Sequence, residues 1–103
     1  MKYQIVFQWT LADSGLGYDA LVQIEDDLEA KLSDRHEIDG HDVGSDEFNI
    51  FILTDNPETC FKEVLNILHE EGRRVSFRVA YREVSKSSYT VLWPAGASDF
   101  KVG

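Results

Sequence analysis

The order in which two hydrophobic periods alternate along the chain constrains its fold more than any other sequence feature. Residues 2–10 have a period of two, with apolar side chains at odd positions from Tyr3 to Trp9, which predicts a strand with one buried face. From Tyr18 to Ser33 the apolar residues recur every three or four positions, which predicts an amphipathic helix. The same period returns from Pro57 to Gly72, after a helix-start signal at residues 55–58.

The segments between and after the helices predict strands and turns. Residues 11–17, with Gly15 and Gly17, favour a turn, and Phe48 to Leu53 is an almost continuous apolar run typical of a central strand. The remaining strands are expected within Glu37 to Glu47, from Val75 to Arg82, and from Tyr89 to Trp93, before Pro94.

This order predicts an α+β fold, the ferredoxin-like βαββαβ two-layer sandwich. Both helices would cover one face of an antiparallel sheet, and an extra C-terminal strand would pair with the fourth strand. The length of 103 residues fits a single domain, which we expect to span residues 1–94, with a tail at 95–103.

The second sheet face would then carry no helix. It would expose the polar side chains of Gln4, Gln8, Arg78 and Arg82 beside a few apolar ones. Paired guanidinium groups with nearby amides could hold the carboxylate or phosphate of a small anionic ligand. Pairing of the two arginines with the chain's own acidic residues is the competing interpretation.

The segment from Asp39 to Glu47 holds one imidazole and four carboxylates. Its spacing matches neither a calcium-binding EF-hand loop nor the two-histidine helix of zinc proteases, so we predict no metal site. A hairpin whose glycines take positive φ and whose acids keep an edge strand from pairing is the favoured reading. Within it, His41 with Asp42 is a candidate acid–base pair, and a solvated imidazole is the alternative.

Other reactive residues favour structural roles. His69 falls near the end of the second helix, where it would interact with the helix dipole. Cys60 is the single cysteine, so no intrachain disulfide can form, and its place on the apolar stripe predicts a buried, inert thiol. Nothing in the pattern indicates a cofactor.

Charge narrows the classes of partner. Ten basic against nineteen acidic residues give a net charge of −9, which disfavours nucleic acid and anionic membranes as partners. The first residues alternate instead of forming an apolar run, which argues against a signal peptide, and no stretch reaches the roughly 18 apolar residues of a membrane span. A cytoplasmic location is expected.

Residues Asp39 to Gly44, Asn49 to Ile52, Thr54-Asp55 and Tyr89 to Pro94 together resemble a group of small uncharacterised bacterial proteins of about this length. The resemblance implies a self-contained cytosolic domain with the βαββαβ plan, and it implies no activity and no catalytic residues.

Three functions follow as hypotheses. The first is a non-enzymatic binding or interaction module that uses the uncovered sheet face, with a homodimer as one form of that interaction. The second is a small cofactor-independent enzyme, similar to dimeric monooxygenases or isomerases, with its site near His41 and Asp42 or on the open face. The third is an acidic protein that occupies a basic surface on another macromolecule.

Overall fold

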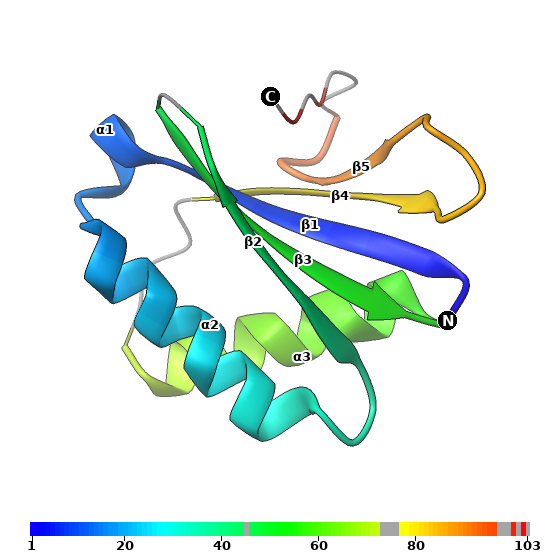
Figure 1. The fold of residues 1–103 in the computed structure, drawn as a ribbon, viewed down its shortest axis with the longest axis horizontal. Coiled ribbons are helices and arrows are strands. Elements are labelled where there is room, and N and C mark those ends of the chain that lie inside the picture. Colours follow the sequence, from blue (N-terminus) through cyan, green and yellow to red (C-terminus); the bar gives the residue numbers. More distant parts are fainter. Residues whose placement is uncertain (45, 73–76, 97–99, 101, 103) are drawn as a thin grey trace.

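The computed structural model describes residues 1–44, 46–72, 77–96, 100 and 102. Its elements, shown in Figure 1, are strands, two long helices and one single helical turn. In chain order they are β1 (Tyr3–Thr10), α1 (Leu11–Ser14), α2 (Tyr18–Leu32), β2 (Glu37–Val43), β3 (Glu47–Thr54), α3 (Pro57–Glu70), β4 (Phe77–Glu83) and β5 (Thr90–Trp93). None of the helices in the described residues combines the length and the apolar character of a membrane span.

The five strands form one antiparallel sheet in the order β2-β3-β1-β4-β5. Helices α2 and α3 lie together on one side of it (Figure 1). The α+β two-layer fold predicted from the sequence is therefore confirmed, including the extra C-terminal strand. The sheet departs from the strict four-stranded ferredoxin-like plan through β5 and through the helical turn α1, which replaces part of the turn expected at residues 11–17.

The core lies between the sheet and the two helices. The apolar stripe predicted for α2 is buried in full, and β1 contributes every second side chain. Helix α3 buries the stripe that includes Cys60, Val64 and Leu68. Because β1 pairs with both β3 and β4, its neighbours Ile50 and Val79 face Phe7 across the two ladders and close the centre of this core.

Local signals fix both ends of α3. The Asn56 side chain accepts a hydrogen bond from the backbone N–H of Thr59 at 3.1 Å, and Pro57 is the first helical residue. After Glu70, Gly72 takes a φ of +71°, a conformation that favours glycine and stops the helix. The fourth strand was expected from Val75, which lies outside the described residues, and β4 is described from Phe77.

The helix layer is narrower than the sheet. Helix α2 packs against β2 and β3, and α3 packs against β1. Two packed helices span about 20 Å, whereas five strands at roughly 4.8 Å spacing need more room once side chains are added. The strand β5 and the outer side of β4 therefore extend past the helices, and the side chains there are only half-buried or exposed, as at Tyr81 and Thr90.

Candidate functional site

The helix-free face of the sheet is organised in three rows that run across the strands. Strand pairing places a polar row at one end, an apolar row in the middle and a mixed row at the other end. The rows are Asp42–Asn49–Gln8–Arg78, Gly40–Phe51–Val6–Ala80–Val91 and Glu37–Leu53–Gln4–Arg82. Five of the six residues predicted as ligand-binding lie on this face, and His41 lies on the other.

The centre of this face is closed, which corrects the expectation that Gln8 is exposed there, whereas Gln4, Arg78 and Arg82 are half-buried. Gln8 is only 4 % exposed, and Val6, Asn49 and Ala80 are fully buried. Part of the cover comes from the end of the chain, because the ring of Phe100 lies 5.7 Å from the guanidinium carbon of Arg78. Alternation along a strand assigns side chains to a face, but it does not show what else the chain lays over that face.

Two predicted anion-binding residues at the other end of the face have structural partners. The Nε atom of Arg82 donates to the Gln4 side-chain oxygen at 3.2 Å. Its Nη1 atom lies within hydrogen-bonding distance of three carbonyl oxygens, that of Glu83 at the end of β4 and those of Val84 and Lys86 in the β4–β5 connection. Arg82 therefore holds the turn between the two strands in shape.

The polar row at the opposite end contains an incompletely satisfied amide. Gln8 Nε2 donates to Asn49 Oδ1 at 3.0 Å, which joins the side chains of β1 and β3. Among the described residues, the Nδ2 group of Asn49 is buried without a hydrogen-bond acceptor. Arg78 sits next to Gln8 in the same row, so the row presents amide and guanidinium donors side by side.

His41 does not pair with Asp42, whose side chain lies on the other face of the sheet. Its Nδ1 atom lies 2.7 Å from Oε1 of Glu25, and its Nε2 atom lies 3.2 Å from the hydroxyl of Tyr18. The imidazole also stacks on Phe48, with ring centroids 5.0 Å apart. Both partners belong to α2 and are seven positions apart, about two helical turns, so they lie on the same face of that helix. Nothing in the sequence pattern links that face to His41, which is why these partners were not predicted.

A second histidine, His36, is the centre of a buried network. Its Nδ1 atom lies 2.8 Å from the Thr54 hydroxyl, and its Nε2 atom lies 3.0 Å from Oε1 of Glu63. The Thr54 oxygen accepts from the backbone N–H of Asn56, so the Thr54 proton is available to Nδ1 while Nε2–H donates to Glu63. The other carboxylate oxygen of Glu63 accepts from Arg35 at 2.6 Å.

Electrostatics in this network follow from its contacts. Burial opposes ionisation of Glu63, but the hydrogen bonds from His36 and Arg35 and the positive charge of Arg35 outweigh it and hold the pKa of Glu63 below its usual value. Burial raises the pKa of the nearby Cys60 thiol to about 12, and the charge of Glu63 adds to the effect. The prediction of a buried thiol is confirmed, and a raised pKa makes it inert.

The acidic segment forms the edge strand β2 and its hairpin to β3. Gly40 has a φ of +118°, and the ladder between β2 and β3 shifts register between Ile38 and Gly40. This is a β-bulge, and exposed acids flank it, so the predicted protected edge is present. Within the described residues, no cluster of three His, Cys, Asp or Glu side chains has the closeness that a metal ion needs.

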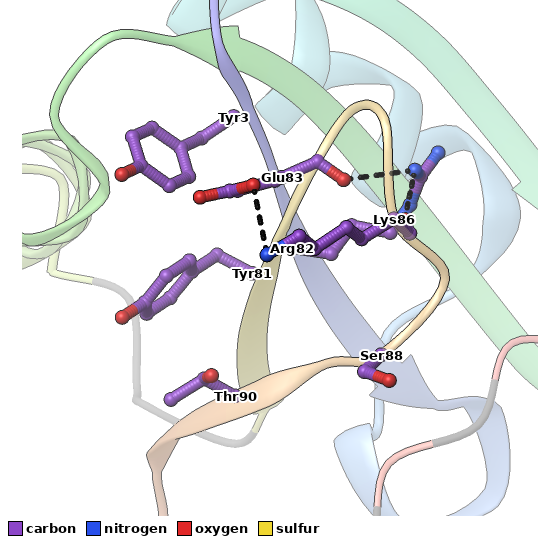
Figure 2. Close-up of a pocket in the computed structure, with 7 residues that line it drawn as sticks. All are labelled: Tyr3, Tyr81, Arg82, Glu83, Lys86, Ser88 and Thr90. Atoms are coloured by element: carbon purple, nitrogen blue, oxygen red, sulfur yellow. Dashed lines mark hydrogen bonds and ion pairs between the residues drawn. The ribbon is translucent and has the colours of Figure 1, made fainter.

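A pocket of about 310 Å³ lies where β4 and β5 extend past the helix layer. We call it the tyrosine pocket; its lining is Tyr3, Tyr81, Arg82, Glu83, Lys86, Ser88 and Thr90. The rings of Tyr3 and Tyr81 meet edge to face, with centroids 5.8 Å apart. In Figure 2 the side chains of both tyrosines, Glu83 and Thr90 point to one side, and the Arg82 guanidinium points away from them.

Charged groups lie beside the two rings in this pocket. Lys86 Nζ lies 3.4 Å from Oε2 of Glu83, and Lys2 Nζ lies 3.9 Å from its Oε1. The ammonium group of Lys2 also sits 5.6 Å from the centre of the Tyr3 ring. The pocket thus combines aromatic surface, hydroxyl groups and charges of both signs, and sequence reasoning missed it because its lining comes from both ends of the chain.

The fold and these sites define a small α+β two-layer domain with a ligand-sized hollow at its sheet margin. Comparison with protein-family models, with curated proteins and with solved structures gave no match.

Proposed function

We propose that the protein is a binding module that takes a small organic ligand in the tyrosine pocket. The observation that carries this proposal is the hollow of about 310 Å³ lined by two tyrosine rings and an adjacent carboxylate–ammonium pair. Ligand pockets in proteins begin at about this size, and they combine apolar or aromatic walls with a few polar groups.

The walls of the pocket stand on rigid parts of the fold. Tyr3 and Glu83 are direct partners in the β1–β4 ladder, and Tyr81 and Thr90 are direct partners in the β4–β5 ladder. The contacts of Arg82 with the carbonyls of Glu83, Val84 and Lys86 fix the turn after β4, which carries Lys86 and Ser88. A site that is already shaped loses little conformational entropy when a ligand binds.

The charged pair in the pocket can exchange partners. The side chains of Lys86 and Lys2 are 69 % and 65 % exposed, and such surface ion pairs contribute little to stability. Glu83 and Lys86 can therefore turn to polar groups of a ligand at small cost. The ligand that fits has a flat or aliphatic body for the tyrosine rings and at least one charged or hydrogen-bonding group.

NMR titration of ¹⁵N-labelled protein with small aromatic amines and acids tests this function. We expect the amide shifts to concentrate at Tyr3, Tyr81, Glu83 and Thr90. Thr90 is an exposed residue of the pocket lining, so Thr90→Arg should fill the pocket and abolish these shifts. The matched control is Ser87→Arg, at an exposed position in the β4–β5 connection that does not line the pocket, and it should keep them. Compounds that bind both variants equally, or that shift other residues instead, would rule out the pocket.

The helix-free face is a second candidate surface, and homodimerisation through it stays a prediction. Half-buried Phe51 and Leu53 favour it, since a partner could cover both side chains. Light scattering at high micromolar concentration tests the dimer, and a monomer there would contradict it. The cytoplasmic location expected from the sequence is likewise a prediction.

A further inference from the structure

A tyrosine, a histidine and a glutamate form a continuous hydrogen-bonded chain on the opposite margin of the sheet from the tyrosine pocket. Tyr18 and Glu25 come from α2, and His41 comes from the edge strand β2. The Tyr18 hydroxyl lies 3.2 Å from Nε2 of His41, and Oε1 of Glu25 lies 2.7 Å from Nδ1. The two ring nitrogens are thus both engaged, each by a different kind of group.

The chemistry of the partners fixes the direction of the proton donors. A carboxylate oxygen accepts only, so the Nδ1–H of a neutral His41 donates to Glu25. The lone pair on Nε2 then accepts the Tyr18 hydroxyl proton. A hydroxyl, an imidazole base and an orienting carboxylate in this order are the arrangement that activates a nucleophile.

Accessibility decreases along the same chain. The Tyr18 residue is 51 % exposed, the His41 side chain 28 % and the Glu25 side chain 12 %. Tyr18 is therefore open to solvent, while the orienting carboxylate is mostly shielded from water. The imidazole is also held by Phe48, which stacks on it with an interplanar angle of 15°.

We propose that Tyr18 is an activated nucleophile that accepts acyl groups from carboxylic esters with good leaving groups, with His41 as its general base. Glu25 is a positioning residue that holds the imidazole in the tautomer required. The inference goes beyond ligand binding in the tyrosine pocket and does not depend on it. It concerns one covalent transfer to the protein, without turnover.

The transfer is balanced with 4-nitrophenyl acetate as the acyl donor. The Tyr18 oxygen attacks the carbonyl carbon while its proton moves to Nε2 of His41. The bond between the carbonyl carbon and the nitrophenyl oxygen breaks, and 4-nitrophenolate leaves with the electron pair. His41 then releases its proton to the solution, and an acetyl ester remains on Tyr18. The reaction runs forward because 4-nitrophenol is a stronger acid than a tyrosine phenol.

The test is the rate of acetylation of each tyrosine at neutral pH, measured by peptide mass spectrometry. We expect Tyr18 to react at least about tenfold faster than Tyr3 or Tyr89, less than the roughly hundredfold typical of enclosed sites because this site is open to water. His41→Gln should reduce Tyr18 to the rate of the other tyrosines. His69→Gln, which changes an exposed imidazole on α3, is the matched control and should leave the rate unchanged.

Variants of Glu25 separate positioning from packing. Glu25→Gln keeps the size of the side chain, but its amide NH₂ can also donate to Nδ1 and no longer fixes the tautomer, so the Tyr18 rate should fall several-fold. Glu25→Leu removes the acceptor and should lower the rate several-fold, although it fills the same space. Circular dichroism establishes that each variant is folded before its rate is compared.

Three outcomes would overturn the inference. In the first, Tyr18 reacts no faster than the other tyrosines. In the second, a folded His41→Gln protein acetylates Tyr18 at the original rate, so the imidazole is not the base. In the third, the acetyl group is found on His41 and never on Tyr18, which would make the imidazole itself the nucleophile.

Discussion

At the scale of single residues, His36 joins three parts of the fold. It follows α2, contacts Thr54 at the end of β3 and contacts Glu63 on α3, and it is only 4 % exposed. Both ring nitrogens of this buried imidazole have hydrogen-bond partners, so neither is left unsatisfied away from water. The position is therefore a structural connection, and it explains why this histidine is not available for chemistry.

Removing the charge of Glu63 should make stability less dependent on acid. Because the pKa of Glu63 is lowered in the folded protein, ionisation favours folding above the unfolded value of about 4.3, and this contribution is lost as the pH falls through the folded value. We expect Glu63→Gln to cost about 1 kcal/mol at pH 7, where a charge-assisted hydrogen bond from His36 is weakened. The difference from the original protein should shrink as the pH falls below about 4.3.

Urea denaturation at pH 7 and at pH 3 measures this difference. Glu29→Gln is the control, since Glu29 is exposed on α2 and should change stability by less than about 0.5 kcal/mol. A Glu63→Gln protein that differs from the original equally at both pH values would contradict the assignment.

Residue patterns predicted the buried thiol of Cys60 and the protected edge around Gly40, but they did not predict the partners of His41. Asp39 and Asp42 were the candidate partners of the imidazole because they flank His41 along the chain. In a strand, however, the residue that follows His41 points to the opposite face, so Asp42 cannot reach the imidazole. Its partners Tyr18 and Glu25 come from a helix that only the tertiary fold brings near.

At the scale of elements, clear periods predicted both long helices and the strands β1 and β4. A continuous apolar run predicted β3, whereas β2 was expected only as a strand somewhere within Glu37 to Glu47. The sequence pattern missed α1, a helical turn of four residues that ends at Gly15 with a φ of +68°. Such a short helix has no periodicity to detect. The end of Phe48–Leu53 and the start of α3 were predicted closely, since Asn56 and Pro57 are strong local signals.

The bulge in β2 should depend on glycine at position 40. With a φ of +118° the backbone is in a region that side chains disfavour, although a Cβ atom there would meet no neighbour within 4 Å. We expect Gly40→Ala to destabilise the protein by about 1–2 kcal/mol through backbone strain alone.

Thermal denaturation of Gly40→Ala and of the nearby control Asp42→Ala measures this effect. The control replaces an exposed side chain on the same strand and should cost much less. If the two substitutions cost the same, then the conformation of residue 40 does not limit stability.

At the scale of the whole molecule, the tyrosine pocket depends on a mismatch between the two layers. The sequence predicted both layers and the extra strand, but it could not predict the pocket. Whether Tyr3 and Tyr81 are covered depends on how far the helices reach across the sheet, which is a property of packing distances. The cover over the helix-free face could not be predicted from the pattern either, because Phe100 is distant in sequence from Arg78.

The net charge of −9 should make stability sensitive to salt. Excess negative charge repels itself in the compact state, and dissolved ions screen that repulsion within about 10 Å at 0.1 M. We expect the melting temperature to rise by about 2–4 °C between roughly 10 and 200 mM sodium chloride. Calorimetry at matched protein concentrations measures it, and a melting temperature that falls with salt would show that ion pairs such as Arg35 with Glu63 outweigh the repulsion.

The protected edge at β2 also limits how copies of this protein could join through their backbones. A fibre of stacked sheets needs two compatible free edges on every copy, one to accept the previous copy and one to offer to the next. Here the bulge at Gly40 and its flanking acids block one edge, and the other, β5, is four residues long and ends before Pro94. Strand-to-strand association would therefore stop at a pair joined β5 to β5, and the molecule has a built-in barrier against polymerisation.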